Sequence, residues 1–126
     1  MAEEPKLLPP TMRPNKRYIA FEVISEQPIQ YNEFVSTVWN SMFTLLGELG
    51  ASEVNMWFVR NLYDDKNQKG LIKCAHDYVE KMRAVLSLIQ IVSETKVIVK
   101  ILGVTGTIKS AQKKYLTPKD LRSFTK

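Results

Sequence analysis

Two segments far apart in the chain alternate apolar and polar side chains with a period of two. RYIAFEVI at residues 17–24 places Ile19, Phe21 and Val23 on one side, and KVIVKIL at residues 96–102 has the same period. Successive side chains of a β-strand point to opposite faces of its sheet. The alternation therefore predicts two half-buried strands, one near each end of the chain.

The residues between these strands predict a helix and a hairpin. Residues 32–49 carry apolar side chains at helical spacing, with Asn32 as a candidate N-cap and Gly50 as the stop. Residues 55–63 are rich in aromatic and β-branched side chains, and the turn sequence DDKNQKG leads from them into the return strand LIKCAH. Asp77, three residues before Glu80, then resembles the capping-box start of a second helix that reaches about residue 91.

The resulting order is strand, helix, strand, strand, helix, strand and a final basic helix. It predicts an α+β fold of the ferredoxin-like or RRM-like split β-α-β type, with a four-stranded antiparallel sheet, helices packed on it and a C-terminal basic helix. We assign residues 17–116 to this single domain. Four prolines predict a flexible lead-in over residues 1–16, and residues 117–126 form a predicted basic tail.

No segment of the sequence suits a membrane span or a signal peptide. The longest nearly apolar stretch, residues 84–92, is interrupted by Ser87 and Gln90, and the chain starts with Glu3 and Glu4 where a signal peptide needs positive charge. We therefore expect a cytoplasmic protein that does not bind membranes.

The predicted helix over residues 32–49 is apolar around roughly half of its circumference. Its remaining side is polar but charged only near the ends, at Glu33 and Glu48. A solvated helix face usually carries more charge, so this pattern favours cover by something besides the sheet. Trp39 and Phe43 are the candidate protein-interface residues, because large aromatic side chains often anchor partners. The alternative is that both belong to the core.

Positive charge is concentrated at the two ends of the chain. Residues 1–17 hold four Lys and Arg against two Glu, and residues 96–126 hold eight against one Asp, whereas the whole chain has a formal charge of only +5. This distribution is typical of proteins that bind a polyanion, because Lys and Arg displace counterions from phosphates. A solvated basic tail is the alternative.

The sequence LGVTGTIK at residues 102–109 joins the last predicted strand to the basic helix. Its glycines let a ligand approach the backbone, Thr105 or Thr107 can cap the helix, and free amides at a helix start attract anions. A plain connecting turn is the alternative. The candidate nucleic-acid contacts are Arg13, Lys16, Arg17, Gly103, Thr105, Gly106, Thr107, Lys109, Lys113 and Lys114.

Residues suited to catalysis or metal binding are scarce. His76 is the single histidine, and Cys74 lies in an alternating apolar run. Asp64 and Asp65 lack the ligand spacing of a calcium loop because Lys66 interrupts it. The predicted third strand lacks the aromatic side chains with which RNA-recognition domains stack bases, so we expect RNA to be held through phosphates, shape and loops.

Five strings together resemble archaeal ribonuclease P protein component 2. They are RYIAFEVISE, LGELGAS, the hairpin WFVR with KGLIKC, HDYVEKMR and LGVTGTIK, and they occur in the same order over residues 13–116. The resemblance implies a subunit of the ribonucleoprotein that removes 5′ leaders from precursor transfer RNA. In that family the RNA subunit, with bound Mg²⁺, performs the hydrolysis, and the protein stabilises the folded RNA.

The same resemblance implies several partners. They are ribonuclease P RNA, protein component 3, a second copy of the chain in a two-plus-two assembly, and other ribonuclease P proteins. It implies no catalytic residue, no metal and no cofactor bound by this chain. The rival interpretation from the residues alone is a ferredoxin-like dimerising or ligand-sensing module without nucleic acid, for which the basic ends would be dispensable. A small enzyme would need a motif that we do not find.

Overall fold

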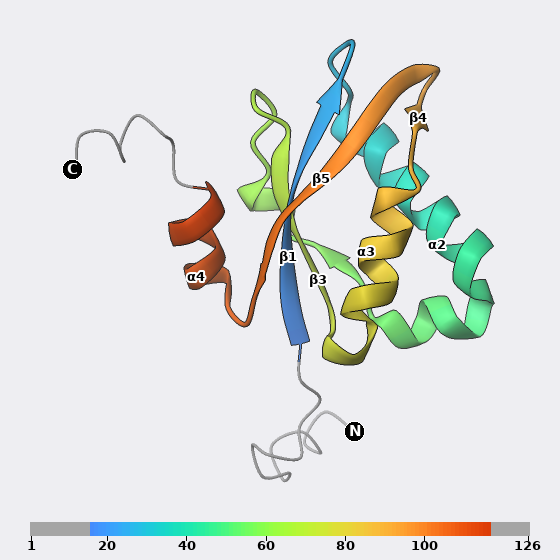
Figure 1. Cartoon of the computed structure of the whole chain (residues 1–126), viewed down its shortest axis with the longest axis vertical. Coiled ribbons are helices and arrows are strands. Elements are labelled where there is room, and N and C mark those ends of the chain that lie inside the picture. The colour runs from blue at the N-terminus through green and yellow to red at the C-terminus, as the bar shows by residue number, and fades with distance from the viewer. Residues whose placement is uncertain (1–15, 117–126) are drawn as a thin grey trace, which may run out of the picture.

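The computed structural model describes residues 16–116 and contains one antiparallel sheet with helices on both faces (Figure 1). The strands lie in the order β2-β3-β1-β5-β4. The elements in chain order are β1 (Lys16–Ser25), α2 (Tyr31–Val54), β2 (Trp57–Phe58), η2 (Arg60–Leu62), β3 (Lys69–Ala75), η3 (His76–Tyr78), α3 (Val79–Ser87), β4 (Ile91–Val92), β5 (Thr95–Thr105), α4 (Ile108–Ala111) and η4 (Gln112–Leu116). The predicted α+β class and the order of the main elements are confirmed.

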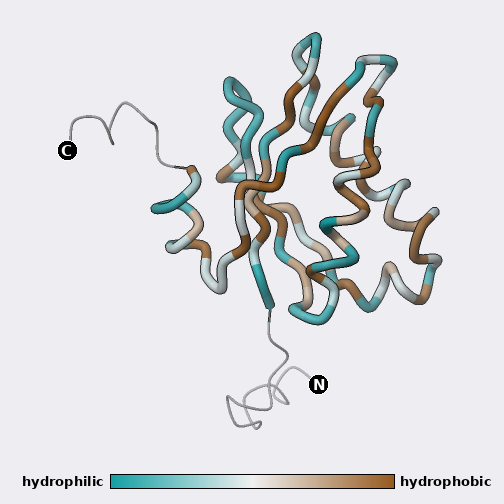
Figure 2. The backbone as a smooth tube through the Cα atoms, viewed as in Figure 1, coloured by the Kyte–Doolittle hydropathy of each residue, from teal (hydrophilic) through white to brown (hydrophobic). Residues whose placement is uncertain are grey.

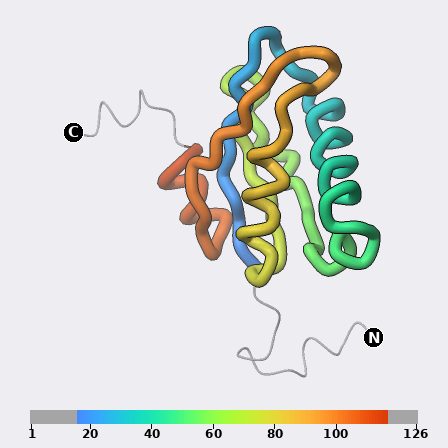
Figure 3. Tube along the Cα trace, turned by 45° about the vertical axis from the view of Figure 1, so that its right-hand side comes forward, coloured from blue at the N-terminus to red at the C-terminus, as the bar shows by residue number. Residues whose placement is uncertain are grey.

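The alternation of β1 divides the interior into two cores. Ile19, Phe21 and Val23 belong to the larger core, which α2 and α3 cover. Tyr18 and Ala20 belong to a smaller cluster on the other face, beneath α4 and η4. The two views in Figures 1 and 3 agree that α4 lies across the sheet from α2 and α3.

Aromatic rings fill one end of the larger core. The ring of Phe21 lies 5.3 Å from that of Phe34 on α2, and the ring of Phe58 meets both edge-on. Tyr63 packs at the border of this group, 4.6 Å from the ring of Tyr31. Figure 2 shows the strand centres as hydrophobic and the turns at the upper end of the sheet as hydrophilic. The hydrophobic residues thus lie in the interior of the sheet, where these rings pack.

Helix α2 does not end at Gly50, so that prediction is wrong. Gly47 has a φ of 74°, which kinks the helix, and the chain then resumes helical geometry to Val54. Asn55, in the left-handed conformation, ends it. The predicted Asn32 cap is also wrong, because α2 begins at Tyr31 without a side-chain capping bond.

The second helix and the sheet also differ from the prediction. Helix α3 begins at Val79, after the turn η3, without a side-chain cap, and it ends at Ser87. Ile91 and Val92 leave the helix to pair with Lys96 and Thr95, so the sheet has five strands rather than four. The predicted strand over residues 55–63 keeps only β2, since Arg60–Leu62 form a 3₁₀ turn.

The domain limits predicted from the sequence stay predictions. The proposed lead-in and tail lie outside the described residues, except that Lys16 already begins β1. Arg13 also lies outside them. Among residues 16–116, no helix is long and apolar enough to cross a bilayer.

Candidate nucleic-acid interface

The sheet brings the two basic ends of the described chain together. Strands β1 and β5 are antiparallel neighbours, and Tyr18 pairs with Thr105. Lys16 and Arg17, just before Tyr18, therefore lie at the same end of the sheet as the turn that leads into α4, which carries Lys109. Segments about ninety residues apart in the sequence thus contribute to one surface.

The glycine-containing stretch is partly strand rather than loop. Gly103 and Thr105 belong to β5, where a bulge shifts the register between Ala20 and Phe21. The buried Thr105 hydroxyl donates to the Thr107 carbonyl oxygen at 2.9 Å. The Thr107 hydroxyl oxygen accepts from the Ser110 amide at 3.1 Å, so the predicted helix cap is confirmed at Thr107.

Helix α4 is too short to act as an anion site through its dipole. It has four residues and continues as a π-helical turn, η4, of five. Because a helix macrodipole sums aligned peptide units, a single turn contributes little charge at its start. Binding at this surface must therefore rest on the lysine side chains.

Gly103 is explained by packing within the protein. A Cβ atom at this position would overlap the ring of Tyr115, which lies directly over the strand. Gly106 differs, because a Cβ there would meet nothing within 4 Å. The absence of a side chain at Gly103 thus allows η4 to pack directly against the sheet.

This seat orients the basic side chains toward solvent. Ala111 is fully buried against Tyr18, Ala20 and Leu71, and the other apolar side chains of the cluster surround it. Three lysines extend from the exposed positions of the same two turns, namely Lys109, Lys113 and Lys114. The packing therefore fixes where their charges lie.

The sheet face beneath α4 is itself basic. The strand registers place five lysines and one glutamate on this face: Lys16, Lys69, Lys73, Lys96, Lys100 and Glu22. On the opposite side, α2 carries three glutamates and neither Lys nor Arg, and α3 carries one glutamate with Lys81 and Arg83, so that side has less positive charge. The described domain is therefore electrostatically polarised, and a polyanion would be attracted to the face that carries α4.

The lysines of β3 and β5 were not among the predicted nucleic-acid contacts. Lys69 and Lys73 are four positions apart in β3, and Lys96 and Lys100 lie in β5 on the same side of the sheet. Their even spacing in the sequence already places the lysines of each strand on one face. Only the strand pairing shows that both strands put their lysines on the face that bears α4.

The aromatic residues predicted as a protein interface lie on α2, away from the basic face. Trp39 is half-buried against the core, Phe43 is 45 % exposed, and their rings stack at 5.9 Å. Leu45 and Leu49 on the same helix are 48 % and 82 % exposed. This exposed apolar surface supports the expectation that the helix has further cover, while its partner stays a prediction.

The residues with catalytic potential do not form a catalytic constellation in the described part of the chain. Burial raises the pKa of the Cys74 thiol to about 11, so it is protonated at neutral pH. His76 and Asp77 make an ion-pair contact of 2.8 Å at the surface. Residues 16–116 contain no cluster of three or more His, Cys, Asp or Glu suited to a metal.

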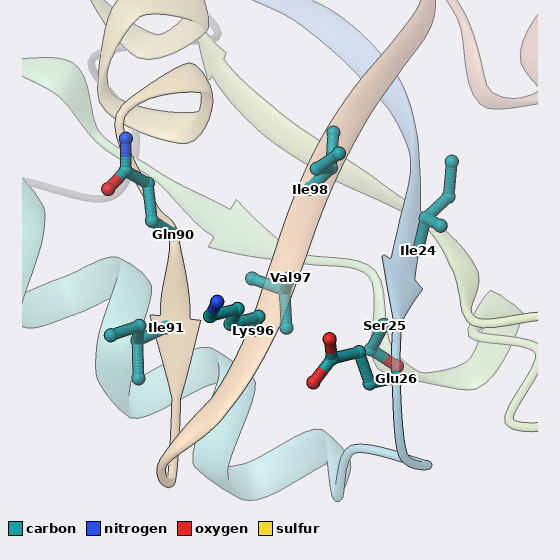
Figure 4. A pocket seen from close by; sticks show the side chains of 8 residues that line it. All are labelled: Ile24, Ser25, Glu26, Gln90, Ile91, Lys96, Val97 and Ile98. Atoms are coloured by element: carbon teal, nitrogen blue, oxygen red, sulfur yellow. The ribbon is translucent and has the colours of Figure 1, made fainter.

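A pocket of about 600 Å³ lies at the opposite end of the sheet from α4 (Figure 4). Ile24 from β1, Ile91 from β4 and Ile98 from β5 supply its apolar wall, and Lys96 and Glu26 border it. The pocket lies on the same face of the sheet as α4, at the far end, and shares Lys96 with the basic face.

Comparison with known proteins gives consistent matches. Residues 17–116 match the model of the Rpp14/Pop5 family. The chain is 41 % identical over 117 residues to ribonuclease P protein component 2 of Pyrococcus furiosus, covering 93 % of this chain and 96 % of that one. It is 37 % identical over 117 residues to the protein of the same name from Methanothermobacter thermautotrophicus, covering 90 % and 94 %.

A solved structure shares the fold. A chain in the cryo-EM structure of yeast ribonuclease MRP superposes with a TM-score of 0.60 at 12 % identity. The match covers 90 % of this chain and 93 % of that chain. The arrangement of strands and helices therefore extends to proteins of very different sequence.

Proposed function

Because the chain belongs to the Rpp14/Pop5 family, we propose that it is a protein subunit of ribonuclease P. In this role it binds and stabilises the catalytic RNA, which cleaves 5′ leaders from precursor transfer RNA. The observation that carries the proposal is that Lys16 of β1 lies on the face that bears α4, at the end of the sheet where the chain leads to Lys109, whereas Arg17 lies on the opposite face. Apart from the edge strand β4, the strand order β2-β3-β1-β5 also supports a ferredoxin-like arrangement.

The basic face acts on the RNA backbone rather than on base sequence. Lysine ammonium groups neutralise phosphates and release counterions, so binding weakens steeply as salt rises. Such contacts fix position and orientation and carry no sequence information directly. The phosphodiester chemistry belongs to the RNA subunit and its Mg²⁺, and this chain holds the RNA fold against electrostatic repulsion.

The exposed side of α2 is the proposed protein interface. Trp39 and Phe43 form a stacked pair, Leu45 and Leu49 are exposed elsewhere on the same helix, and burying such side chains stabilises a complex by about 1.5–3 kcal/mol each. We assign this surface to protein component 3. A two-plus-two assembly with self-contact, together with other ribonuclease P proteins, completes the proposed complex in the cytoplasm.

Reconstituted cleavage of precursor transfer RNA at limiting Mg²⁺ tests the proposal. Ribonuclease P RNA and component 3 are combined with this protein or with Lys109→Glu/Lys114→Glu. Wild type should stimulate cleavage, and the charge-reversed protein should lose most of the stimulation while still binding component 3. The matched control, Lys66→Glu/Arg83→Glu, changes net charge equally at exposed positions outside the α4-bearing face.

Two results would count against this function. Folded wild-type protein that fails to stimulate cleavage would favour the ligand-sensing or dimerising module. Equal loss of stimulation by both charge-reversed proteins would show that total charge matters and that the α4-bearing face has no special role.

A further inference from the structure

One row of paired residues crosses the sheet beside α4 and ends in an exposed tryptophan. Thr105 pairs with Tyr18, Tyr18 pairs with Lys73, and Lys73 pairs with Trp57 on the edge strand β2. Because neighbouring strands lie about 4.7–4.9 Å apart, Trp57 is about 14 Å from Thr105 across the sheet. The turn into α4 starts at one end of this row, and Trp57 closes the other.

The face on which Trp57 lies is fixed by its neighbour. Phe58 contacts the rings of Phe21 and Phe34 in the larger core, so the preceding side chain must point to the opposite face. Trp57 therefore shares the α4-bearing face. It is 65 % exposed, the largest exposed fraction of an aromatic side chain among the exposed large hydrophobic residues of the described chain.

Positive charge surrounds this ring. Lys73 is directly opposite Trp57 on β3, where paired Cβ atoms are about 4.5–5.5 Å apart. Lys16 pairs with Ala75, which places it diagonally next to Lys73 on the same face. No acidic side chain of β2 or β3 lies on this face. A large apolar ring beside two ammonium groups suits a ligand that has both a planar π surface and negative charge.

We infer that Trp57 is a stacking platform for an unpaired RNA base, whose flanking phosphates contact Lys73 and Lys16. The inference rests on the proposed function and adds a site of a different chemical kind to it. Binding of single strands commonly combines aromatic stacking with a basic track along the backbone. Here the aromatic side chain comes from the edge strand β2, whereas the middle of the sheet face is covered by α4.

The expected contribution is large enough to measure. Stacking of a base on an aromatic side chain contributes about 1–3 kcal/mol, so Trp57→Leu should weaken binding of an unpaired oligoribonucleotide about 5- to 150-fold. Trp57→Phe should retain most of the affinity. Lys73→Ala should reduce the slope of log K against log salt by about 0.7, the value for one phosphate of a single strand.

The two tryptophans of the chain provide an internal control. Trp39→Phe leaves Trp57 as the sole emitter, and Trp57→Phe leaves Trp39, which lies on α2. A short unpaired oligoribonucleotide should quench the emission of Trp57 and leave that of Trp39 unchanged. Fluorescence anisotropy of the labelled oligonucleotide reports binding independently, and thermal unfolding checks that each variant folds.

Several outcomes would overturn the inference. Bound oligonucleotide without a change in Trp57 emission would show that no base stacks there, and equal quenching by duplex RNA would exclude an unpaired base. Quenching by component 3 alone would make Trp57 a protein contact. In each case wild-type stimulation of precursor cleavage would be unaffected, so these failures are distinct from failure of the proposed function.

Discussion

Replacing Gly103 by alanine tests whether the seating of η4 depends on close approach to β5. The added Cβ would overlap the Tyr115 ring, so either the ring shifts or the whole turn moves away from the sheet. Strand propensity alone predicts the opposite sign, because glycine inside a strand is about 0.5–1 kcal/mol less favourable than alanine. The variant therefore separates packing from propensity.

The magnitude follows from the packing of the smaller cluster. Forcing an extra methyl into a packed site costs about 1–3 kcal/mol, and we expect Gly103→Ala to lower the free energy of unfolding by about 2 kcal/mol. With a urea m-value of about 1–3 kcal/mol/M, the midpoint should fall by about 0.7–2 M. Gly106→Ala is the matched control. Its added methyl would contact nothing within 4 Å, so its effect should stay within about 0.5 kcal/mol.

A double-mutant cycle identifies the ring as the cause. Tyr115→Ala should itself destabilise the domain, but in its background the cost of Gly103→Ala should disappear, because no ring remains to be displaced. Urea unfolding followed by circular dichroism gives all four free energies. Additive effects, or a stabilising Gly103→Ala, would refute the reasoning.

Two further predictions concern buried polar groups. The Tyr63 hydroxyl is buried without a hydrogen-bond partner within residues 16–116, so Tyr63→Phe should raise the free energy of unfolding by about 1 kcal/mol, measured by urea unfolding; a clear loss of stability would reveal a partner for it. Burial raises the pKa of the Cys74 thiol from 9.0 to about 11, so the stability that the neutral thiol contributes is complete below about pH 9 and is lost as pH rises toward 11. Cys74→Ala should flatten that part of the stability profile, and an unchanged profile would contradict this origin.

The fold was predictable from the sequence where a residue pattern fits only one type of secondary structure. The alternation in β1 placed Ile19, Phe21 and Val23 on one side, where the larger core lies, and Thr107 had the side chain and position of a helix cap. The end of α3 was not predictable in this way. Ile91 and Val92 fit both a helical face and a strand, and only the pairing with Thr95 and Lys96 decides between them.

The candidate site was predicted in composition but not in extent. The sequence showed basic residues at both ends of the chain, whereas the strand lysines and Trp57 could be placed only through the register between strands. Residues 55–63 were predicted as one strand of a hairpin, from their aromatic and β-branched side chains alone. One step in register separates the core-facing Phe58 from the solvent-facing Trp57, and composition carries no information about that step.

The position of α4 limits how nucleic acid can use the sheet. Tyr18, Ala20 and Leu71, which would form the centre of an open binding face, are buried beneath Ala111 and its neighbours. Bases therefore cannot lie flat on the middle strands. An RNA backbone must instead pass along the solvent-exposed side of α4. Because the Tyr115 ring packed on Gly103 fixes the position of α4, Gly103→Ala should weaken RNA binding as well as stability, whereas Gly106→Ala should leave stability unchanged. A Gly103→Ala protein that binds RNA like wild type under folding conditions would show that the lysines act without a fixed seat.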